Sequence, residues 1–344
     1  MIYKDSAEAY DACIHRWDTL AKPIDGLGKY EKIIAGIGGI QRTDCPSVRK
    51  RTLIVFLADN GIVEEKVSQS GPDVTHKVAE AMSIGRSTVC VMAKEAGVRV
   101  LPVDVGMKGE RVPGVEDLRI RDGSRNFMKE PAMTQDETLR AIDAGYQVAA
   151  SVKKNGDELI LLGEMGIGNT STATALSCAM LSADPIESTG SGAGLPDGFV
   201  RHKREVIKEA LGKYSYDPGN ALEVLSIFGG YDIAAMVGVI KAASELNIPV
   251  VTDGLITLAA AFMAERMYPG AKDVCIASHD PREPMGKRLT RELGLQPVIS
   301  ADMALGEGTG AVLLIPQLDV CMALYNDGLR FEGLGIEAYE RYKK

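Results

Sequence analysis

Two short segments, each with one glutamate set among glycines, have the composition of catalytic loops. Residues 305–310 read LGEGTG and place Glu307 between two glycines, and residues 161–171 read LLGEMGIGNTS and place Glu164 after an apolar run. Flanking glycines let the backbone approach a ligand closely, and a carboxylate there can serve as a general base. A solvated loop glutamate would also explain the first segment alone, because ordinary loops favour glycine too. The second segment of the same kind favours a catalytic interpretation.

The overall composition limits the class of protein before any chemistry is assigned. The chain has 344 residues, of which 45% are hydrophobic and 25% charged, as in an ordinary globular protein with one large α/β core or two modest domains. Its net charge of -8 argues against nucleic acid or an anionic membrane as the main partner. A phosphorylated small molecule remains allowed, because helix N-termini and one lysine can hold a phosphate without a basic surface.

The cysteines and the N-terminal segment indicate a reducing, intracellular setting. The six cysteines are far apart and form no C-x-x-C pair, so neither a zinc site nor a disulfide framework is predicted. No cluster of His and carboxylate residues has metal-ligand spacing, and we expect no metal. The first residues, MIYKDSAEAYDA, lack the apolar region of a signal peptide, and no uninterrupted apolar run is long enough to span a bilayer. We therefore expect a soluble cytoplasmic protein.

The pattern of apolar residues predicts an α/β fold, with a parallel sheet flanked by helices. Short apolar runs predict strands at residues 53–58, 98–105, 158–162, 249–252, 274–277 and 311–315. Segments of helical period predict helices at residues 73–96, 134–154, 171–182, 199–211, 233–246, 256–267 and 283–293.

Four predicted strands run directly into polar or glycine-bearing turns. These turns are Asp59-Asn60-Gly61, Gly163-Glu164, Asp253-Gly254 and Ser278-His279. Ligands of open α/β sheets bind at the carboxyl ends of the strands, so these turns are expected to converge on one pocket.

The two ends of the chain differ from the middle. Residues 1–50 and 318–344 are helix-like and contain no clear strand, so we expect them to form a small helical domain beside a large catalytic domain of residues 51–317. The alternative is that they are terminal helices of one domain. Residues 109–125 are charged, carry glycines and have no clear period, which is typical of a loop or lid.

Several further segments suggest binding of a phosphate or an aromatic ring. Residues 190–194, GSGAG, resemble a phosphate-approach loop and lead into a helix that carries Lys203, although a lone glycine-rich pentapeptide is weak evidence and this lysine could be solvated. Met165, Ile167 and Leu305 adjoin the two glutamates and could form a flat apolar slot for a ring, or could simply be core residues. Neither a G-x-S-x-G elbow nor a P-loop lysine motif is present, which argues against nucleophilic hydrolases and kinases.

Ordered motifs run along almost the whole chain. They include LAKPIDGLGKYEKI (20–33), LADNGIVEEKVS (57–68), GSRNFMKEPAMT (123–134), LGEMGIGNTSTATAL (162–176), GSGAGL (190–195), FGGYDIAAMVG (228–238), PVVTDGLITLAAA (249–261), SHDPREP (278–284) and LGEGTGA (305–311). Together they resemble the nicotinate-nucleotide:5,6-dimethylbenzimidazole phosphoribosyltransferase family, which makes the α-ribazole phosphate of the cobamide lower ligand.

This resemblance implies a Rossmann-like parallel sheet and a reaction without a cofactor. The reaction moves 5-phosphoribose from nicotinate mononucleotide to an aromatic acceptor, with inversion at the anomeric carbon and release of nicotinate. By the resemblance Glu307 is the general base, best suited to this if an apolar slot buries it and raises its pKa, and Glu164 supports the sugar or acceptor. The nucleotide-binding residues it implies are Gly166, Gly168, Asn169, Thr170, Ser171, Gly190, Gly192, Lys203, Asp253, Gly254, Ser278, Gly306 and Gly308. The acceptor-binding residues it implies are Asp59, Ser70, Lys77, Met165 and Leu305.

The chain departs from the family pattern mainly at the acceptor end. The usual KPPGSLG, ADHG and SxxPQxVTxQ stretches become KPIDGLG (22–28), ADNG (58–61) and SQSGPDVTHK (68–77), so that Pro72 and Lys77 stand about where glutamines are usual. A site built to bond a ring nitrogen discriminates strongly on that bond, so the acceptor need not be dimethylbenzimidazole.

Three alternatives therefore stay open beside the ordinary family activity. The chain could resemble relatives that ribosylate phenol or p-cresol as two-subunit assemblies, or be a weakly catalytic partner subunit of a heterodimer. It could also be a nucleotide-binding α/β protein with unrelated chemistry. The resemblance implies a homodimer or a heterodimer with a homologous subunit.

Overall fold

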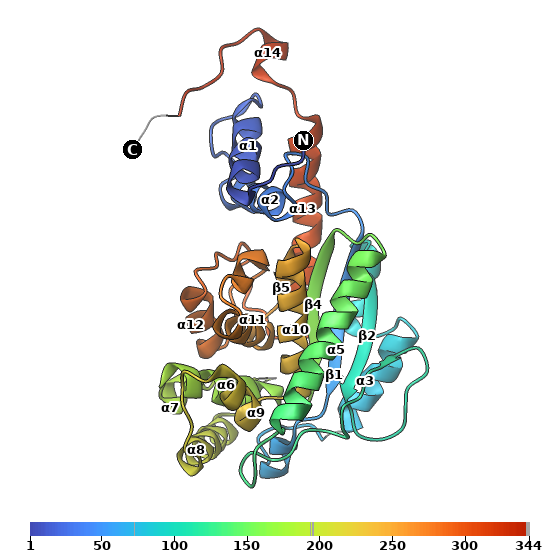
Figure 1. Ribbon diagram of the computed structural model, residues 1–344, viewed down its shortest axis with the longest axis vertical. Helices are drawn as coiled ribbons and strands as arrows, with labels where there is room; N and C mark the ends of the chain where they lie inside the picture. Colours follow the sequence, from blue (N-terminus) through green and yellow to red (C-terminus); the bar gives the residue numbers. More distant parts are fainter. Residues whose placement is uncertain (72, 193, 195, 342–344) are drawn as a thin grey trace.

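A six-stranded parallel sheet forms the centre of the molecule (Figure 1). The computed structural model describes residues 1–71, 73–192, 194 and 196–341. The strands are β1 (Arg51–Ala58), β2 (Arg99–Gly106), β3 (Glu116–Asp117), β4 (Leu159–Met165), β5 (Val250–Thr252) and β6 (Cys275–Ala277), in the spatial order β3-β2-β1-β4-β5-β6. The order reverses between β1 and β4, which is the switch point where doubly wound sheets bind ligands. The predicted fold class and five of the six predicted strands are confirmed.

The sheet is apolar on both faces because helices cover both. Along β1, Leu53, Val55 and Leu57 point into one hydrophobic cluster, and Ile54 and Phe56 point into the other. Such continuous apolar strands are typical of a parallel sheet buried between two helical layers.

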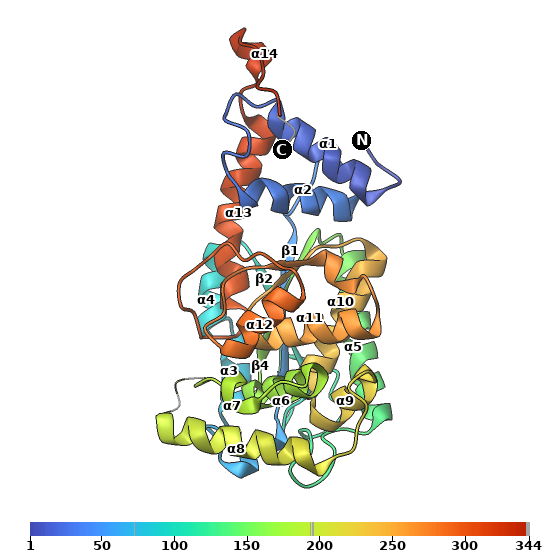
Figure 2. The same cartoon turned by 90° about the vertical axis from the view of Figure 1, so that its left-hand side faces the viewer.

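The helices form two layers, one on each face of the sheet (Figure 2). One layer contains α5 (Gln135–Lys154), α6 (Asn169–Leu181), α8 (Asp197–Lys213), α9 (Ala221–Phe228), α10 (Tyr231–Leu246), α11 (Leu255–Met267) and α12 (Pro284–Glu292). The other contains α3 (Asp73–Ser83), α4 (Thr88–Glu95) and α13 (Thr309–Asp327), continued by α1 (Ser6–Asp18) and α2 (Lys29–Gln41). Three short helical turns, α7 (Pro185–Ser188), η1 (Gly61–Glu65) and η2 (Ala271–Val274), complete this part of the chain.

The strand predicted at residues 311–315 is wrong, because this run lies inside helix α13. An apolar run of five residues cannot be assigned by period alone, since a helix buried on most sides is as continuously apolar as a buried strand. Among the described residues, α13 has the length and composition that would suffice to cross a membrane, but 56% of its apolar 18-residue stretch is buried inside the fold.

The single helix predicted at residues 73–96 is two helices, α3 and α4. Gly85 has φ +71° and ends the first. Ser87 begins the second, because its hydroxyl accepts a hydrogen bond from the backbone N–H of Cys90.

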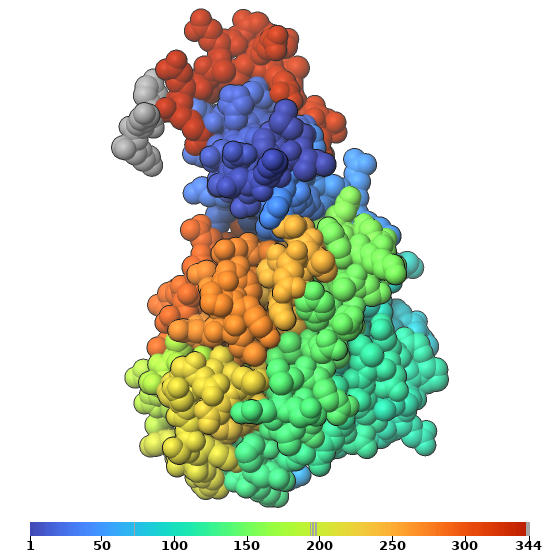
Figure 3. Space-filling view, viewed as in Figure 1, coloured from blue at the N-terminus to red at the C-terminus, as the bar shows by residue number. Residues whose placement is uncertain are grey.

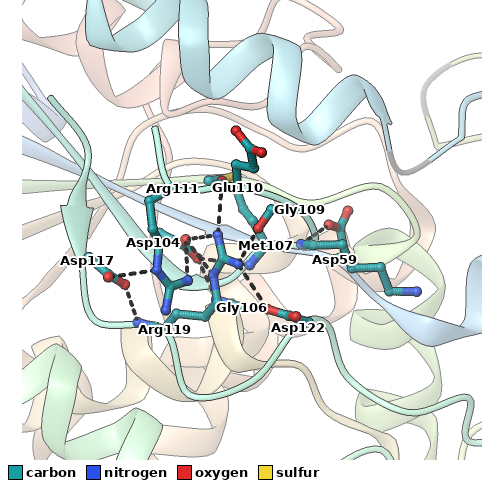
Figure 4. A network of polar contacts seen from close by, with 11 residues as sticks. Asp59, Asp104, Gly106, Met107, Gly109, Glu110, Arg111, Asp117, Arg119 and Asp122 are labelled. Carbon is teal, nitrogen blue, oxygen red and sulfur yellow. Dashed lines mark hydrogen bonds and ion pairs between the residues drawn. The ribbon is translucent and has the colours of Figure 1, made fainter. Parts of the chain in front are cut away.

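An ionic network ties residues 109–125 to the end of β2 (Figure 4). The buried Asp104 carboxylate is 2.7 Å from the Arg119 guanidinium, and Arg111 pairs with Asp117 of the short edge strand β3 at 2.7 Å. Arg119 also donates to the carbonyl of Gly109 at 2.7 Å. The segment predicted as a loop or lid is thus held by Arg119 to β2 and by Arg111 to β3.

The N-terminal helices and the C-terminal segment gather at one end of the molecule (Figure 3). Trp17 of α1 packs edge-on against Tyr325 of α13, with ring centroids 4.9 Å apart, and the short helix α14 (Phe331–Leu334) lies beyond. Helix α13 passes without interruption from the sheet into this end, although it contains Pro316. The division into residues 1–50 plus 318–344 and residues 51–317 therefore remains a proposal, with its boundary inside one helix.

Candidate active site

A cavity of about 350 Å³ opens at the carboxyl ends of β4, β5 and β6. Its walls are the turns that follow these three strands, two valines of α3 and the loop that precedes α13. Three of the four predicted strand-end turns therefore meet at one cavity, whereas the turn Asp59-Asn60-Gly61 does not line it.

Glu164 lies at the end of β4 and is buried at the floor of the cavity. Its carboxylate accepts a hydrogen bond from the side-chain amide of Asn169 at the start of α6. Burial, reinforced by the nearby negative charge of Asp232, raises the pKa of Glu164 to about 8. This carboxyl group therefore holds a proton at neutral pH in the absence of ligand.

Asp232 is a functional candidate that the sequence reasoning missed. It is fully buried in the first turn of α10, and its Oδ2 accepts from the same Asn169 amide at 3.1 Å. Burial raises the pKa of Asp232 to about 6. The pair of glycines before it, Gly229 and Gly230, could have signalled a close approach at this helix start.

Glu307 lies in a loop of three successive residues with left-handed backbone. The φ angles are +90° at Gly306, +57° at Glu307 and +89° at Gly308. The Glu307 carboxylate accepts from the backbone N–H of Val89 at 3.3 Å, at the N-terminus of α4, where the helix dipole favours a negative charge. Glu307 is only half-buried, so the strong burial expected for it falls on Glu164 instead.

Asp253 follows β5 and joins this loop to the sheet. Its two carboxylate oxygens accept from the backbone N–H groups of Gly308 at 3.1 Å and Gly310 at 2.8 Å. His279 Nδ1 is 3.8 Å from Asp253 Oδ1, and burial lowers the pKa of this imidazole. Burial raises the pKa of Asp253 to about 7.

Lys203 lies behind the part of the cavity wall that Thr170 and Gly192 form, and it has no exposed surface. Its ammonium group donates to the Thr170 hydroxyl at 2.8 Å, and burial lowers its pKa to about 8. The nearby Gly192 donates its N–H to Glu283 at 2.9 Å and accepts from Arg282 at 3.4 Å. A buried lysine beside a glycine turn and a helix start is suited to an anion, and the solvated alternative for Lys203 is wrong.

Apolar side chains line the outer part of the cavity. Met165, Ile167 and Leu305 contribute, as expected for a flat slot, and Leu305 is 54% exposed. Val74 and Val78 of α3 form the facing wall, which the sequence reasoning did not identify.

Of the residues predicted to form the site, some line the cavity and others lie outside it. Those on the cavity are Glu164, Glu307, Gly166, Asn169, Thr170, Gly192, Asp253, Gly254, Gly306, Ser70, Met165 and Leu305. Those not on it are Gly168, Ser171, Gly190, Lys203, Ser278, Gly308, Asp59 and Lys77.

Several members of the second group support the cavity from behind, and two lie elsewhere. Asp59 accepts from the backbone N–H of Lys108 at 2.7 Å, and Lys77 faces solvent and pairs with Asp73 at 2.7 Å. Pro72, which replaces a family glutamine, lies outside the described residues, as does Ala193 of the glycine-rich loop. Within the described part of the chain, no group of three His, Cys, Asp or Glu side chains is placed to hold a metal ion.

Comparison with known proteins gives matches over almost the whole chain. A family model described as phosphoribosyltransferase matches residues 2–336. The nicotinate-nucleotide–dimethylbenzimidazole phosphoribosyltransferase of Acetivibrio thermocellus is 35% identical, with 97% of this chain and 95% of that protein covered. The protein of the same name from Alkaliphilus metalliredigens is 37% identical, with coverage of 98% and 97%. The crystal structure of CobT from Thermus thermophilus matches with a TM-score of 0.90 and 34% identity, and covers 96% of this chain and 99% of that one.

Proposed function

The chain belongs to the phosphoribosyltransferase family of the nicotinate-nucleotide–dimethylbenzimidazole enzymes, and from this membership we propose its reaction and the roles of its residues. It transfers 5-phosphoribose from nicotinate mononucleotide to an aromatic lower-ligand base, with inversion to an α-glycosidic bond and release of nicotinate. This step supplies the nucleotide of the cobamide lower ligand. The observation that best supports the proposal is the meeting of Glu164 and Glu307 at one cavity above the sheet.

The chemistry asks little of the protein beyond positioning and one proton acceptor. When the bond from the anomeric carbon to the pyridinium nitrogen breaks, its electron pair neutralises the nitrogen, so nicotinate leaves without protonation. The acceptor nitrogen attacks the opposite face of the sugar. Glu307 takes the proton that this nitrogen loses, and Glu164 at the floor of the cavity supports the sugar or the acceptor.

The substrate phosphate would lie near the buried cation of the opposite wall. Lys203, Thr170 and Gly192 lie together there, beside the start of α6. The aromatic acceptor would occupy the apolar slot of Met165, Leu305 and the two α3 valines. Lys203 then acts by charge from behind the wall rather than as a solvated side chain.

The reaction can be tested with the purified chain alone. The protein is incubated with nicotinate mononucleotide and a mixture of dimethylbenzimidazole, benzimidazole, adenine, phenol and p-cresol, and products are identified by mass spectrometry. We expect a ribosylated product from the wild type, and a loss of about 10²- to 10⁴-fold in rate for Glu307→Gln, the range for removal of a general base. Glu209→Gln on the exposed surface of α8 is the matched control. Full activity in Glu307→Gln would exclude Glu307 as the base.

A phenolic acceptor is the second candidate, and the wall of α3 favours it. Val74 and Val78 face the cavity, whereas Lys77 points to solvent, and Ser70 is the polar side chain that the described part of residues 68–78 places on the cavity. An apolar wall offers no hydrogen bond to the second nitrogen of a benzimidazole ring, so it does not favour that acceptor over a phenol. A phenol needs the same carboxylate to remove its O–H proton. Phenyl riboside phosphate as the main product would support this candidate, and benzimidazole product alone would exclude it.

The assembly and location of the chain can also be proposed. We propose a dimer of this chain, since Val320 of α13 and Val91 of α4 are 71% and 58% exposed on neighbouring helices. Sedimentation should give twice the chain mass, and activity that requires a homologous subunit would instead favour the heterodimer. A cytoplasmic location agrees with the free thiols of all six cysteines.

A further inference from the structure

We propose that Asp253 is the positioning residue of the general base, and that it acts through the backbone of the Glu307 loop rather than by binding nucleotide. This inference rests on the role of Glu307 proposed above. It replaces the nucleotide-binding role that the family resemblance implied for Asp253.

The loop of Glu307 has a backbone that needs external support. Three successive residues adopt left-handed φ angles, and the middle one is a glutamate, for which this conformation is uncommon. Within the loop, Thr309 donates both its N–H, at 3.0 Å, and its hydroxyl, at 2.9 Å, to the carbonyl of Gly306. These bonds close the turn, but they do not attach it to the sheet.

Asp253 makes the attachment to the sheet. It follows β5 directly and is 4% exposed, and each of its two oxygens accepts from a different N–H at the start of α13, from Gly308 and from Gly310. A carboxylate with one oxygen on each of two N–H groups fixes both the position and the rotation of the helix start. The start of α13 is thereby positioned by a strand and not by a flexible loop.

The packing around Gly310 shows that this contact leaves no spare room. A Cβ at Gly310 would overlap both His279 Nδ1 and Asp253 Oδ1, so only glycine lets the helix start approach this closely. On the other side, a Cβ at Gly163 of β4 would overlap the carbonyl of Glu307. The backbone that carries the base is therefore packed between β4 and the Asp253 carboxylate.

Both oxygens of Asp253 must be free to accept, and an amide offers only one acceptor oxygen. Asparagine could accept one of the two N–H groups with its oxygen, but its NH₂ would face the other N–H, donor against donor. Asp253→Asn should therefore release one attachment while it keeps the size of the side chain. A displacement of about 1 Å at a reacting group can reduce a rate by about a hundredfold.

Steady-state kinetics with nicotinate mononucleotide and the acceptor found above test this. For Asp253→Asn we expect kcat to fall by about ten- to a hundredfold, and KM for nicotinate mononucleotide to stay within about twofold. In the double variant with Glu307→Gln, the loss should be no greater than that of Glu307→Gln alone, because a base that is absent cannot be misplaced. Asn220→Ala, which removes the side-chain cap of α9, is the matched control and should leave kcat unchanged.

Different outcomes separate this inference from the proposed function. A tenfold or larger rise in KM with unchanged kcat would overturn the inference and restore a nucleotide-binding role for Asp253. Additive losses in the double variant would also overturn it, since they show that the two residues act separately. Full activity of Glu307→Gln would instead remove the proposed base, and the inference with it. If Asp253→Asn does not fold, Asp253→Ser, which keeps one short oxygen acceptor, replaces it under the same criteria.

Discussion

Replacing Glu164 with glutamine should change how the stability of this protein depends on pH. Burial raises the pKa of Glu164 from 4.5 to about 8, so between these values the folded chain holds a proton that the unfolded chain has lost. Stability then falls as pH rises through this window, because folding is coupled to proton uptake. At about 1.4 kcal/mol per pH unit, the free energy of unfolding lost by pH 9 is up to about 5 kcal/mol.

Glutamine has the shape of the protonated glutamic acid and does not titrate. Its oxygen can accept the hydrogen bond from Asn169 that Glu164 accepts now. We therefore expect the wild type and Glu164→Gln to be similarly stable at pH 5, and the variant to be the more stable by several kcal/mol at pH 9. Urea unfolding without ligand at pH 5, 7 and 9 measures this, with Glu209→Gln as the matched surface control. Parallel stability curves for the wild type and Glu164→Gln would refute the reasoning.

Three further substitutions test other parts of the site and the fold. Gly163→Ala should reduce both stability and kcat, measured by urea unfolding and steady-state kinetics, because its methyl group would displace the carbonyl of Glu307. Lys203→Met should raise KM for nicotinate mononucleotide about tenfold or more, the scale of a lost bond to a charged group, and the wild-type KM should rise above pH 8, where this buried lysine loses its proton. The ion pair with Arg125 lowers the pKa of Glu137 to about 2. The stabilisation by this ion pair is therefore full above pH 4.5 and is lost as pH falls toward 2. Glu137→Gln should be less stable than the wild type at pH 7, and this difference should shrink in unfolding curves measured at acid pH.

Each of these three predictions has a result that would contradict it. A fully active Gly163→Ala would mean that the loop can shift freely, and an unchanged KM in Lys203→Met would place the phosphate elsewhere. An equal stability difference at pH 7 and pH 3 for Glu137→Gln would show that its ion pair is not the cause.

The sequence predicted the sheet well because its strands are apolar runs that end in polar turns. The run at residues 311–315 has the same composition but follows a turn of glycines that begins a helix, and period cannot separate a buried helix from a buried strand. The break between α3 and α4 was missed although Gly85 and Ser87 are ordinary stop and start signals.

Within the site, the sequence identified residue types better than directions. Glu164 and Glu307 were found because glycines flank them, but the burial expected of Glu307 is found at Glu164, which lies at the end of a central strand. Lys77 was expected at the acceptor, yet one step along α3 turns a side chain by about 100°, and its neighbour Val78 faces the cavity instead. Asp232 was missed because it is distant in sequence from both glutamates and shares only the Asn169 amide with Glu164.

Helix α13 also has a mechanical consequence. Its 19 residues make a stiff rod about 28 Å long, which begins beside Glu307 and ends among the packed terminal helices. A tilt of about 5° around one end of such a rod moves the other end by about 2.5 Å. A force applied to either chain terminus would therefore tilt α13 and displace the loop that carries Glu307. For immobilisation or fusion, an attachment point away from the termini, such as the exposed side of α8, would apply no force to α13.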